Sequence, residues 1–188
     1  MMSFAIAAML ASSAPQPLVE GNPAAVVRVI IYEDLACSDC AVFRRMLDEK
    51  LLPRYGAKVA FEHRDFPLAK HAWARTAAIA ARFWQEASPE LAIALRKHLL
   101  GSIRQTTPAN FNERLAAFAR LHGADPQKAV AALEDPRLAG LVEKDLQEGV
   151  ARGVAKTPTV FVDGAPFIET FTFEEVSKAI DAALAAAQ

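Results

Sequence analysis

Both cysteines of this 188-residue chain lie in one short motif, Cys37-Ser38-Asp39-Cys40. An apolar, β-branched run precedes the motif and a segment with helical spacing follows it, so we expect the thiols where a strand ends and a helix begins. At a helix N-terminus, unpaired backbone N–H groups and a partial positive charge lower a thiol pKa from about 8.5 to between about 3.5 and 7.5. The setting therefore predicts that Cys37 is a nucleophilic thiolate.

Cys40 lies one turn further into the expected helix, where a side chain is typically more buried. From there its thiol can attack a mixed disulfide formed on Cys37, which releases the substrate and leaves a Cys37–Cys40 disulfide. We therefore predict that Cys40 is the resolving thiol of a redox-active pair.

Other uses of a Cys-x-x-Cys motif fit the sequence less well. A zinc site needs two further ligands, and no two of the histidines His63, His71, His98 and His122 have the short spacing usual in zinc modules. Haem attachment requires a histidine where Ala41 stands, and a structural disulfide across four residues would remove little chain entropy. We expect no metal and no bound cofactor, and we assign no catalytic role to these histidines.

A second candidate for the site is Thr157-Pro158-Thr159, which opens a later apolar run. Proline has no N–H to donate to a sheet, so Pro158 is expected at the start of a strand, where a cis bond costs only about 0.5 to 1 kcal/mol. On its own this would be an ordinary proline at a loop-to-strand joint. Together with the upstream cysteines it indicates an active site.

Two strands and a helix position the cysteine motif. The run AAVVRVIIY is typical of a strand covered on both faces of a parallel sheet, helical spacing then continues until Pro53 and Gly56, and KVAFEH predicts a second strand. Strand, helix and strand in this order form a βαβ unit with parallel strands. The expected ranges are strand 24–32, helix 37–52 and strand 57–63.

The segment after this unit has helical patterning throughout, with N-cap residues directly before prolines at several of its breaks. After Gly153 the pattern returns to strands around Asp163-Gly164, a strong hairpin sequence, and one more helix follows. The expected helices are 68–86, 89–100, 110–122, 126–134, 136–152 and 173–187.

These elements predict an α/β fold in which a βαβ unit and a ββα unit are separated by an all-helical cap. We expect an N-terminal segment at 1–20, a domain formed by 21–67 and 153–188, and a helical insertion at 68–152. With 53% hydrophobic and 23% charged residues and a net charge of -1, the chain has the composition of a soluble globular protein. It has no cluster of Lys and Arg, so nucleic acid is not an expected partner.

The N-terminal segment bears on where the protein works. Residues 1–14, MMSFAIAAMLASSA, resemble the apolar and small-residue parts of a secretory signal, without the usual basic start. The apolar stretch Phe4–Ala11 is far shorter than the roughly 20 residues needed to cross a bilayer, so we expect no membrane span. We expect an exported, periplasmic protein; the alternative is a short N-terminal helix retained in a cytoplasmic one.

Four segments carry a resemblance to a known family. They are Gly21-Asn22-Pro23, EDLACSDC at residues 33–40, RDFPL at 64–68 and TPTVFVDG at 157–164. In these the chain resembles the DsbA-like thiol–disulfide oxidoreductases of the thioredoxin superfamily, over nearly all of its length after residue 20. The resemblance implies a thioredoxin-like fold with a helical cap over the active site.

The resemblance also implies roles for single residues. Pro158 matches a cis-proline packed against the cysteine pair, and Thr157 would present its backbone to an extended substrate and influence Cys37. Ser38 and Asp39 would contact the substrate, but they replace the proline and histidine of strongly oxidising members. A carboxylate near Cys37 should stabilise its thiolate less than a histidine would, which leaves the redox direction open.

A buried acid, which many thioredoxin-like proteins carry six residues before the first cysteine, is replaced here by Ile31. Glu33 shares the face of Ile31 if the strand stays regular, and it could accept the proton of Cys40. The alternative is that Glu33 and Asp34 are solvated residues at a strand end.

The function predicted from these residues is exchange of disulfides with cysteine pairs of protein substrates, with an unidentified redox partner recycling Cys37 and Cys40. Export would favour an oxidase, because disulfides persist in the periplasm, whereas a cytoplasmic location would favour a reductase. Two other functions remain open on the same fold. One is a peptide-binding module in which the cysteines are incidental, and the other is a glutathione-linked transferase or isomerase.

Overall fold

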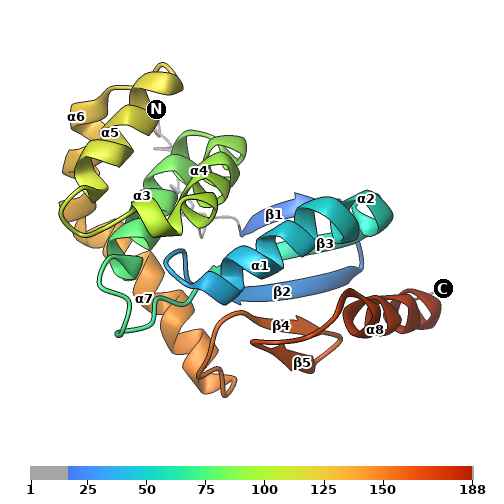
Figure 1. Cartoon of the computed structure of the whole chain (residues 1–188). Helices are drawn as coiled ribbons and strands as arrows, with labels where there is room; N and C mark the ends of the chain where they lie inside the picture. The colour runs from blue at the N-terminus through green and yellow to red at the C-terminus, as the bar shows by residue number, and fades with distance from the viewer. Residues whose placement is uncertain (1–16, 188) are drawn as a thin grey trace, which may run out of the picture.

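The computed structural model describes residues 17–187, and its centre is one five-stranded sheet (Figure 1). In space the strands follow the order β1-β3-β2-β4-β5. Strands β2 and β3 pair in parallel, as a βαβ unit requires, and the other neighbours pair antiparallel. The strands are β1 (Leu18–Gly21), β2 (Val27–Glu33), β3 (Val59–Asp65), β4 (Thr159–Val162) and β5 (Ala165–Ile168).

Strand β1 is not predicted from the sequence. It pairs antiparallel with β3, and its last residue, Gly21, has a φ of 83°. A Cβ at Gly21 would lie 2.4 Å from the carbonyl oxygen of Val59, so glycine is needed where β1 turns toward β2. The boundary expected at residue 20 therefore falls within a strand. The division into domains stays a prediction, and the signal-like stretch 1–14 lies outside the described residues.

The helix after β2 runs three residues beyond its predicted end. Helices α1 (Ser38–Met46) and α2 (Leu52–Tyr55) are joined by a π-helical turn, Leu47–Leu51, and Pro53 lies inside α2. Proline has no N–H, and in a regular α-helix its ring clashes with the carbonyl four residues back. The N–H of Leu52 bonds to the carbonyl of Leu47, five residues back, and this wider turn accommodates Pro53.

Five helices lie between β3 and β4, and their prediction from the sequence is confirmed. Ser88, Asp125 and Asp135 cap three of them by accepting backbone N–H bonds, and a proline occupies the first turn of each. Short 3₁₀ turns at Ile103–Gln105 and Ala132–Glu134 follow the second and fourth helix. The helices are α3 (Ala74–Ala87), α4 (Pro89–Gly101), α5 (Phe111–Leu121), α6 (Pro126–Ala131) and α7 (Pro136–Ala151).

The first of these helices begins at Ala74, six residues later than predicted. The buried carboxylate of Asp34 accounts for the difference, because its Oδ2 accepts the Leu68 N–H at 2.8 Å and lies 2.8 Å from Nδ1 of His71. These bonds hold residues 68–71 in a loop on the end of β2.

Helices cover both faces of the sheet (Figure 1). On one face, Phe43 of α1 and Val176 and Ile180 of α8 (Phe173–Ala186) pack on the strands. On the other face, Tyr32 and Phe66 pack with residues of α7. A third cluster fills the helical insertion and includes both cysteines. The motif therefore lies where the insertion meets the sheet.

The hairpin between β4 and β5 has the predicted turn. Asp163 and Gly164 have φ values of 47° and 80°, the left-handed pair that a two-residue hairpin turn requires.

Candidate active site

The cysteine motif begins α1 at the carboxyl end of β2 (Figure 1). Cys37 is the N-cap residue of the helix, with extended backbone, and Cys40 lies in its first turn. Both thiols are free, and the exposed fraction is 5% for Cys37 and 0% for Cys40. Cys40 is thus the more deeply buried of the two.

The pKa values of the two thiols are displaced in opposite directions. That of Cys37 is lowered to about 5, chiefly because the Cys40 thiol donates a hydrogen bond to its sulfur, with further help from the backbone N–H groups of Cys40 and Asp39. Burial raises the pKa of Cys40, and the bond to Cys37 and the charge on Cys37 raise it further. At neutral pH, Cys37 is a thiolate and Cys40 a thiol.

The loop before β4 faces this pair. The Thr157–Pro158 peptide bond is cis, and the carbonyl oxygen of Thr157 lies 3.4 Å from Sγ of Cys37. The Thr157 hydroxyl is buried and has no hydrogen-bond partner among the described residues, and Thr157 helps to lower the pKa of Cys37. The structure thus brings together the cysteine pair and the Thr157-Pro158 loop, which are 120 residues apart.

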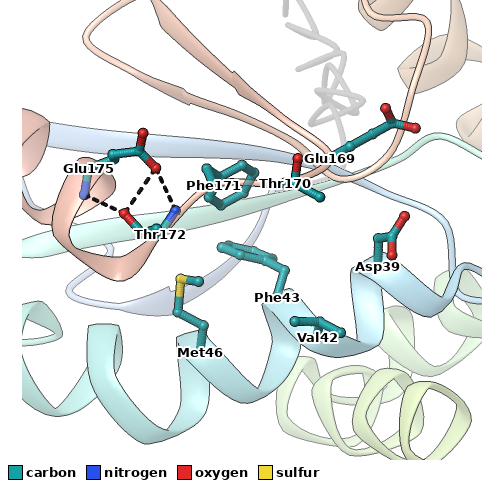
Figure 2. A pocket seen from close by; sticks show the side chains of 9 residues that line it. All are labelled: Asp39, Val42, Phe43, Met46, Glu169, Thr170, Phe171, Thr172 and Glu175. Atoms are coloured by element: carbon teal, nitrogen blue, oxygen red, sulfur yellow. Dashed lines mark hydrogen bonds between the residues drawn. The ribbon is translucent and has the colours of Figure 1, made fainter.

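A groove of about 400 Å³ lies beside the motif, between α1 and the segment that leads from β5 into α8 (Figure 2). The rings of Phe43 and Phe171 pack against each other in it, with 5.7 Å between their centroids, and Val42 and Met46 add apolar surface. Its remaining lining is polar or acidic: Asp39, Glu169, Thr170, Thr172 and Glu175.

The carboxylates of this groove differ in their partners. Glu169 binds Lys156 at 2.6 Å, and Glu175 binds the backbone N–H of Thr172 in a capping box. The side-chain carboxylate of Asp39 has no hydrogen bond or ion pair with a residue between 17 and 187. Asp39, two residues after Cys37, is therefore a carboxylate of the groove whose charge is not neutralised by a partner in the described chain.

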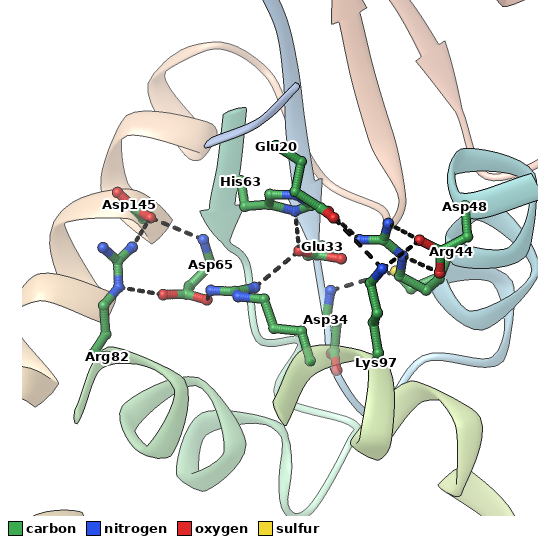
Figure 3. A network of polar contacts seen from close by, with 12 residues as sticks. Glu20, Glu33, Asp34, Arg44, Asp48, His63, Asp65, Arg82, Lys97 and Asp145 are labelled. Carbon is green, nitrogen blue, oxygen red and sulfur yellow. Dashed lines mark hydrogen bonds and ion pairs between the residues drawn. The ribbon is translucent and has the colours of Figure 1, made fainter. Parts of the chain in front are cut away.

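Glu33 lies at the end of β2 and is buried, as is Asp34, so neither is a solvated residue at a strand end. Its Oε1 lies 2.6 Å from Nδ1 of His63 and accepts a bond from Arg96 at 2.9 Å (Figure 3). Burial by itself would raise the pKa of Glu33, but the charge and hydrogen bond of His63 outweigh it and hold the pKa below its usual value. The charge of Glu33 in turn helps to raise the pKa of Cys40.

His63 lies between two carboxylates. Its Nδ1 faces Glu33, and its Nε2 lies 2.9 Å from Oε1 of Glu20 on β1. Burial would raise the pKa of Glu20, but the bonds to His63 and Arg44 lower it to about 2. Two ionised carboxylates accept from the ring, so both ring nitrogens donate and His63 is a buried imidazolium, with a pKa above its usual value despite its burial.

This group belongs to a larger buried network that joins the sheet to the insertion (Figure 3). Arg96 of α4 bonds both Glu33 and Asp65, and Arg82 of α3 bonds Asp65 at 2.5 Å and also Asp145 of α7. On the other side, Arg44 bonds Glu20 and Asp48, each at 2.5 Å.

The sequence reasoning missed Glu20, His63, Arg44 and Arg96 as neighbours of the site. One signal was available for His63, because it lies in the polar run Glu62–Asp65 of a strand whose first three residues are apolar. Charged residues in a strand paired on both sides require buried partners.

Among residues 17–187, no group of three or more His, Cys, Asp or Glu residues could hold a metal ion, and no helix is long and apolar enough to cross a membrane.

Known proteins with the same fold include thiol–disulfide exchange proteins. Wolbachia pipientis alpha-DsbA1 superposes with a TM-score of 0.80 at 20% identity, covering 93% of this chain and 94% of that one. BdbD from Bacillus subtilis gives 0.79 at 21%, covering 90% and 93%. Chlamydia trachomatis DsbA gives 0.75 at 18%, covering 94% and 95%.

Two curated relatives are similar in sequence. A Na⁺/H⁺ antiporter NhaA of Herminiimonas arsenicoxydans is 28% identical over 170 residues, and NhaA 3 of Salinispora tropica is 29% identical over 173. The chain spans about a quarter of the length of each. A family model described as Thioredoxin matches residues 13–182. With a match over most of its length and the fold of the DsbA proteins, the chain belongs to the thioredoxin family.

Proposed function

We propose that this chain is a thiol–disulfide oxidoreductase that oxidises cysteine pairs of polypeptide substrates. The observation that carries the proposal is the opposite displacement of two neighbouring thiol pKa values, with Cys37 a thiolate at the start of α1 and Cys40 a buried thiol behind it. The Thr157-Pro158 loop faces the same pair and supplies a backbone carbonyl beside the reacting sulfur.

In the oxidising direction, a substrate thiolate attacks Sγ of Cys37 in the Cys37–Cys40 disulfide. The S–S bond breaks, Cys40 leaves with the electron pair and takes up a proton, and a mixed disulfide joins Cys37 to the substrate. A second substrate thiolate then attacks the substrate sulfur of this bond and expels Cys37 as a thiolate. Two electrons pass to the protein, and the substrate keeps the new disulfide.

The low pKa of Cys37 favours this direction. A stabilised thiolate is a good leaving group, and it stabilises the reduced form of the protein, which makes the disulfide a stronger oxidant. Cys37 reaches this state without the histidine of the strongly oxidising relatives, chiefly through the Cys40 thiol and with help from the backbone N–H groups of Cys40 and Asp39.

The other site residues take supporting roles in this proposal. Thr157 and Pro158 hold the backbone of an extended substrate, and Ser38 and Asp39 contact its side chains, with Asp39 in the lining of the groove of Figure 2. Glu33 exchanges the proton of Cys40, which has no access to solvent.

The proposed oxidase works in an oxidising compartment such as the bacterial periplasm, where its products persist. Each turnover leaves Cys37 and Cys40 reduced, so a separate redox partner must reoxidise them.

The reduction potential of the Cys37–Cys40 couple tests this direction. We expect equilibration with glutathione buffers to give a value well above the thioredoxin value of about -270 mV and toward the DsbA value of about -120 mV. A value near -270 mV would contradict the oxidase. The exchange itself is tested with a reduced two-cysteine peptide: the wild type forms its disulfide and the Cys37→Ser variant does not. Equal peptide binding but no oxidation by either protein would instead support a binding module.

A further inference from the structure

A second groove lies along α1, next to the one in Figure 2. It has a volume of about 300 Å³ and is formed between α1 and the segment from the end of α4 to the 3₁₀ turn Ile103–Gln105. Ala41, Val42, Leu100 and Ile103 give it an apolar lining. Ser38, the neighbour of Cys37 in sequence, also lines it, so the groove extends to the residue next to the reacting cysteine.

Two arginines, Arg45 and Arg104, give this groove its charge. Both are exposed, and neither has an ion pair with a residue of the described chain. No acidic side chain is among the lining residues. Unpaired guanidinium groups beside an apolar surface suit carboxylates, which they can bind through two parallel N–H bonds.

The groove of Figure 2 has the opposite character. Asp39, Glu169 and Glu175 line it, and no Lys or Arg does. Val42 lines both grooves, so they meet at α1 beside the cysteine motif. A chain that passes over Cys37 therefore meets positive charge on one side and negative charge on the other.

We infer that the groove with Arg45 and Arg104 binds an acidic stretch of the polypeptide substrate, directly beside the cysteine that reacts with Cys37. The inference rests on the proposed function and adds a substrate class to it. Carboxylates of the substrate pair with the two guanidinium groups, and the aliphatic parts of the same residues cover Val42 and Ile103. Substrates with basic residues at that place meet two like charges and react more slowly.

Three peptides test the inference. Each carries the same pair of reduced cysteines, flanked on one side by two Glu, two Gln or two Lys, and a second set carries these residues on the other side. The oxidised full-length protein is mixed with each peptide, and peptide disulfide is measured after acid quenching. We expect the Glu peptide of one set to react at least about fivefold faster than the Lys peptide, with an advantage that shrinks as salt rises.

Two double variants locate the effect. Arg45→Glu with Arg104→Glu should reverse the order of the Glu and Lys peptides and leave the Gln peptide within about twofold of the wild type. Arg120→Glu with Lys128→Glu makes the same change in net charge on exposed side chains of α5 and α6 outside the groove, and should keep the wild-type order. The milder pair Arg45→Gln with Arg104→Gln should abolish the preference without reversing it.

Several results would overturn the inference: equal rates for Glu and Lys peptides with the wild type, reversal in both double variants, or a dependence on Arg45 and Arg104 seen with reduced glutathione but not with peptides. Failure of every peptide, including the Gln peptide, would refute the proposed function itself.

Discussion

Cys37 and Cys40 have the same side chain and opposite acidities. The hydrogen bond between them stabilises the thiolate form of Cys37 and the protonated form of Cys40, so the two sulfurs share one proton. Burial adds to the difference, because Cys40 is closed to solvent and loses more by ionising. The pKa of Cys37 therefore stays low only while Cys40 keeps its proton.

The Cys40→Ala substitution tests this dependence. Removing the donor should raise the pKa of Cys37 from about 5 toward the ordinary value of about 8.5, because the Cys40 bond is the largest cause of the low value. Cys40→Ser keeps a donor and should raise the pKa less. The rate of Cys37 alkylation by iodoacetamide as a function of pH measures both. A pKa that stays near 5 in the alanine variant would assign the effect to the helix N-terminus instead.

The sequence predicted the part of the site that is local and not the part built from distant pairs. Cys37 and Cys40 are recognisable because a four-residue motif at a strand-to-helix junction defines them. Glu33 needs His63 and Arg96, which lie 30 and 63 residues away, to become a buried, ionised carboxylate. No spacing rule connects such residues, since the fold alone brings them together.

At the scale of elements, Arg96 joins the insertion to the sheet. Its guanidinium bonds Glu33 at the end of β2 and Asp65 at the end of β3, so one side chain of α4 ties two parallel strands. Arginine suits this place, because its planar group reaches two carboxylates and stays charged when buried.

Substitution of Arg96 by Met should lower the free energy of unfolding by about 3–5 kcal/mol, because Glu33 and Asp65 would each lose a partner for a buried charge. Arg96→Lys should cost less, since it keeps the charge but reaches only one carboxylate. Arg137→Ala, which breaks exposed ion pairs with Glu86 and Asp135, should leave the free energy of unfolding almost unchanged, because solvent screens these pairs. Urea unfolding compares the three, and similar losses for Arg96→Met and Arg137→Ala would contradict this account.

Helix α7 packs on the sheet through Gly149. A Cβ there would lie 2.7 Å from the ring of Phe66 and 2.9 Å from that of Tyr32, so Gly149→Ala should destabilise the protein by about 1–3 kcal/mol through overpacking. Gly140, on the same helix, has no atom within 4 Å of such a Cβ. Gly140→Ala should therefore stabilise by about 0.5–1 kcal/mol, the usual gain in helix propensity. Thermal unfolding of both variants would contradict the packing argument if Gly149→Ala also stabilised.

Most helices were predictable because residues close to their ends in sequence determine where they begin and end. Asp135 and Pro136, for example, begin α7 by a cap and a fixed φ, whatever the rest of the fold does. The misplaced start of α3 has a different origin, since a carboxylate 34 residues earlier, Asp34, captures Leu68. Strand β1 was missed for the same reason, because four residues become a strand only by pairing with β3.

At the scale of the whole molecule, the cysteine pair lies where the helical insertion meets the sheet. Cys37 and Cys40 belong to the apolar cluster of the insertion, whereas Thr157 and Pro158 lie in the loop that enters β4. The insertion thus keeps Cys40 dry while the sheet presents the loop to Cys37. Both parts of the molecule contact the pair, so its redox state should affect the stability of the whole fold.

This coupling predicts how the stability of the reduced and oxidised forms varies with pH. The pKa of Cys37 is about 5 in the folded reduced protein and about 8.5 in an unfolded chain. Ionisation of Cys37 therefore stabilises the reduced fold as pH rises above 5, fully so above about 8.5, and the contribution is lost as pH falls through 5. The oxidised form has no thiolate at Cys37, so groups that titrate alike in both forms, such as His63 and Glu20, cancel in the difference.

We expect the melting temperature of the reduced form to rise relative to that of the oxidised form between pH 4 and pH 8. Calorimetry of both forms measures the gap. The Cys37→Ser variant, which has no such thiolate, should not gain stability relative to the oxidised wild type over this range. A gap that stays constant or shrinks as pH rises would show that thiolate stabilisation does not make this disulfide an oxidant.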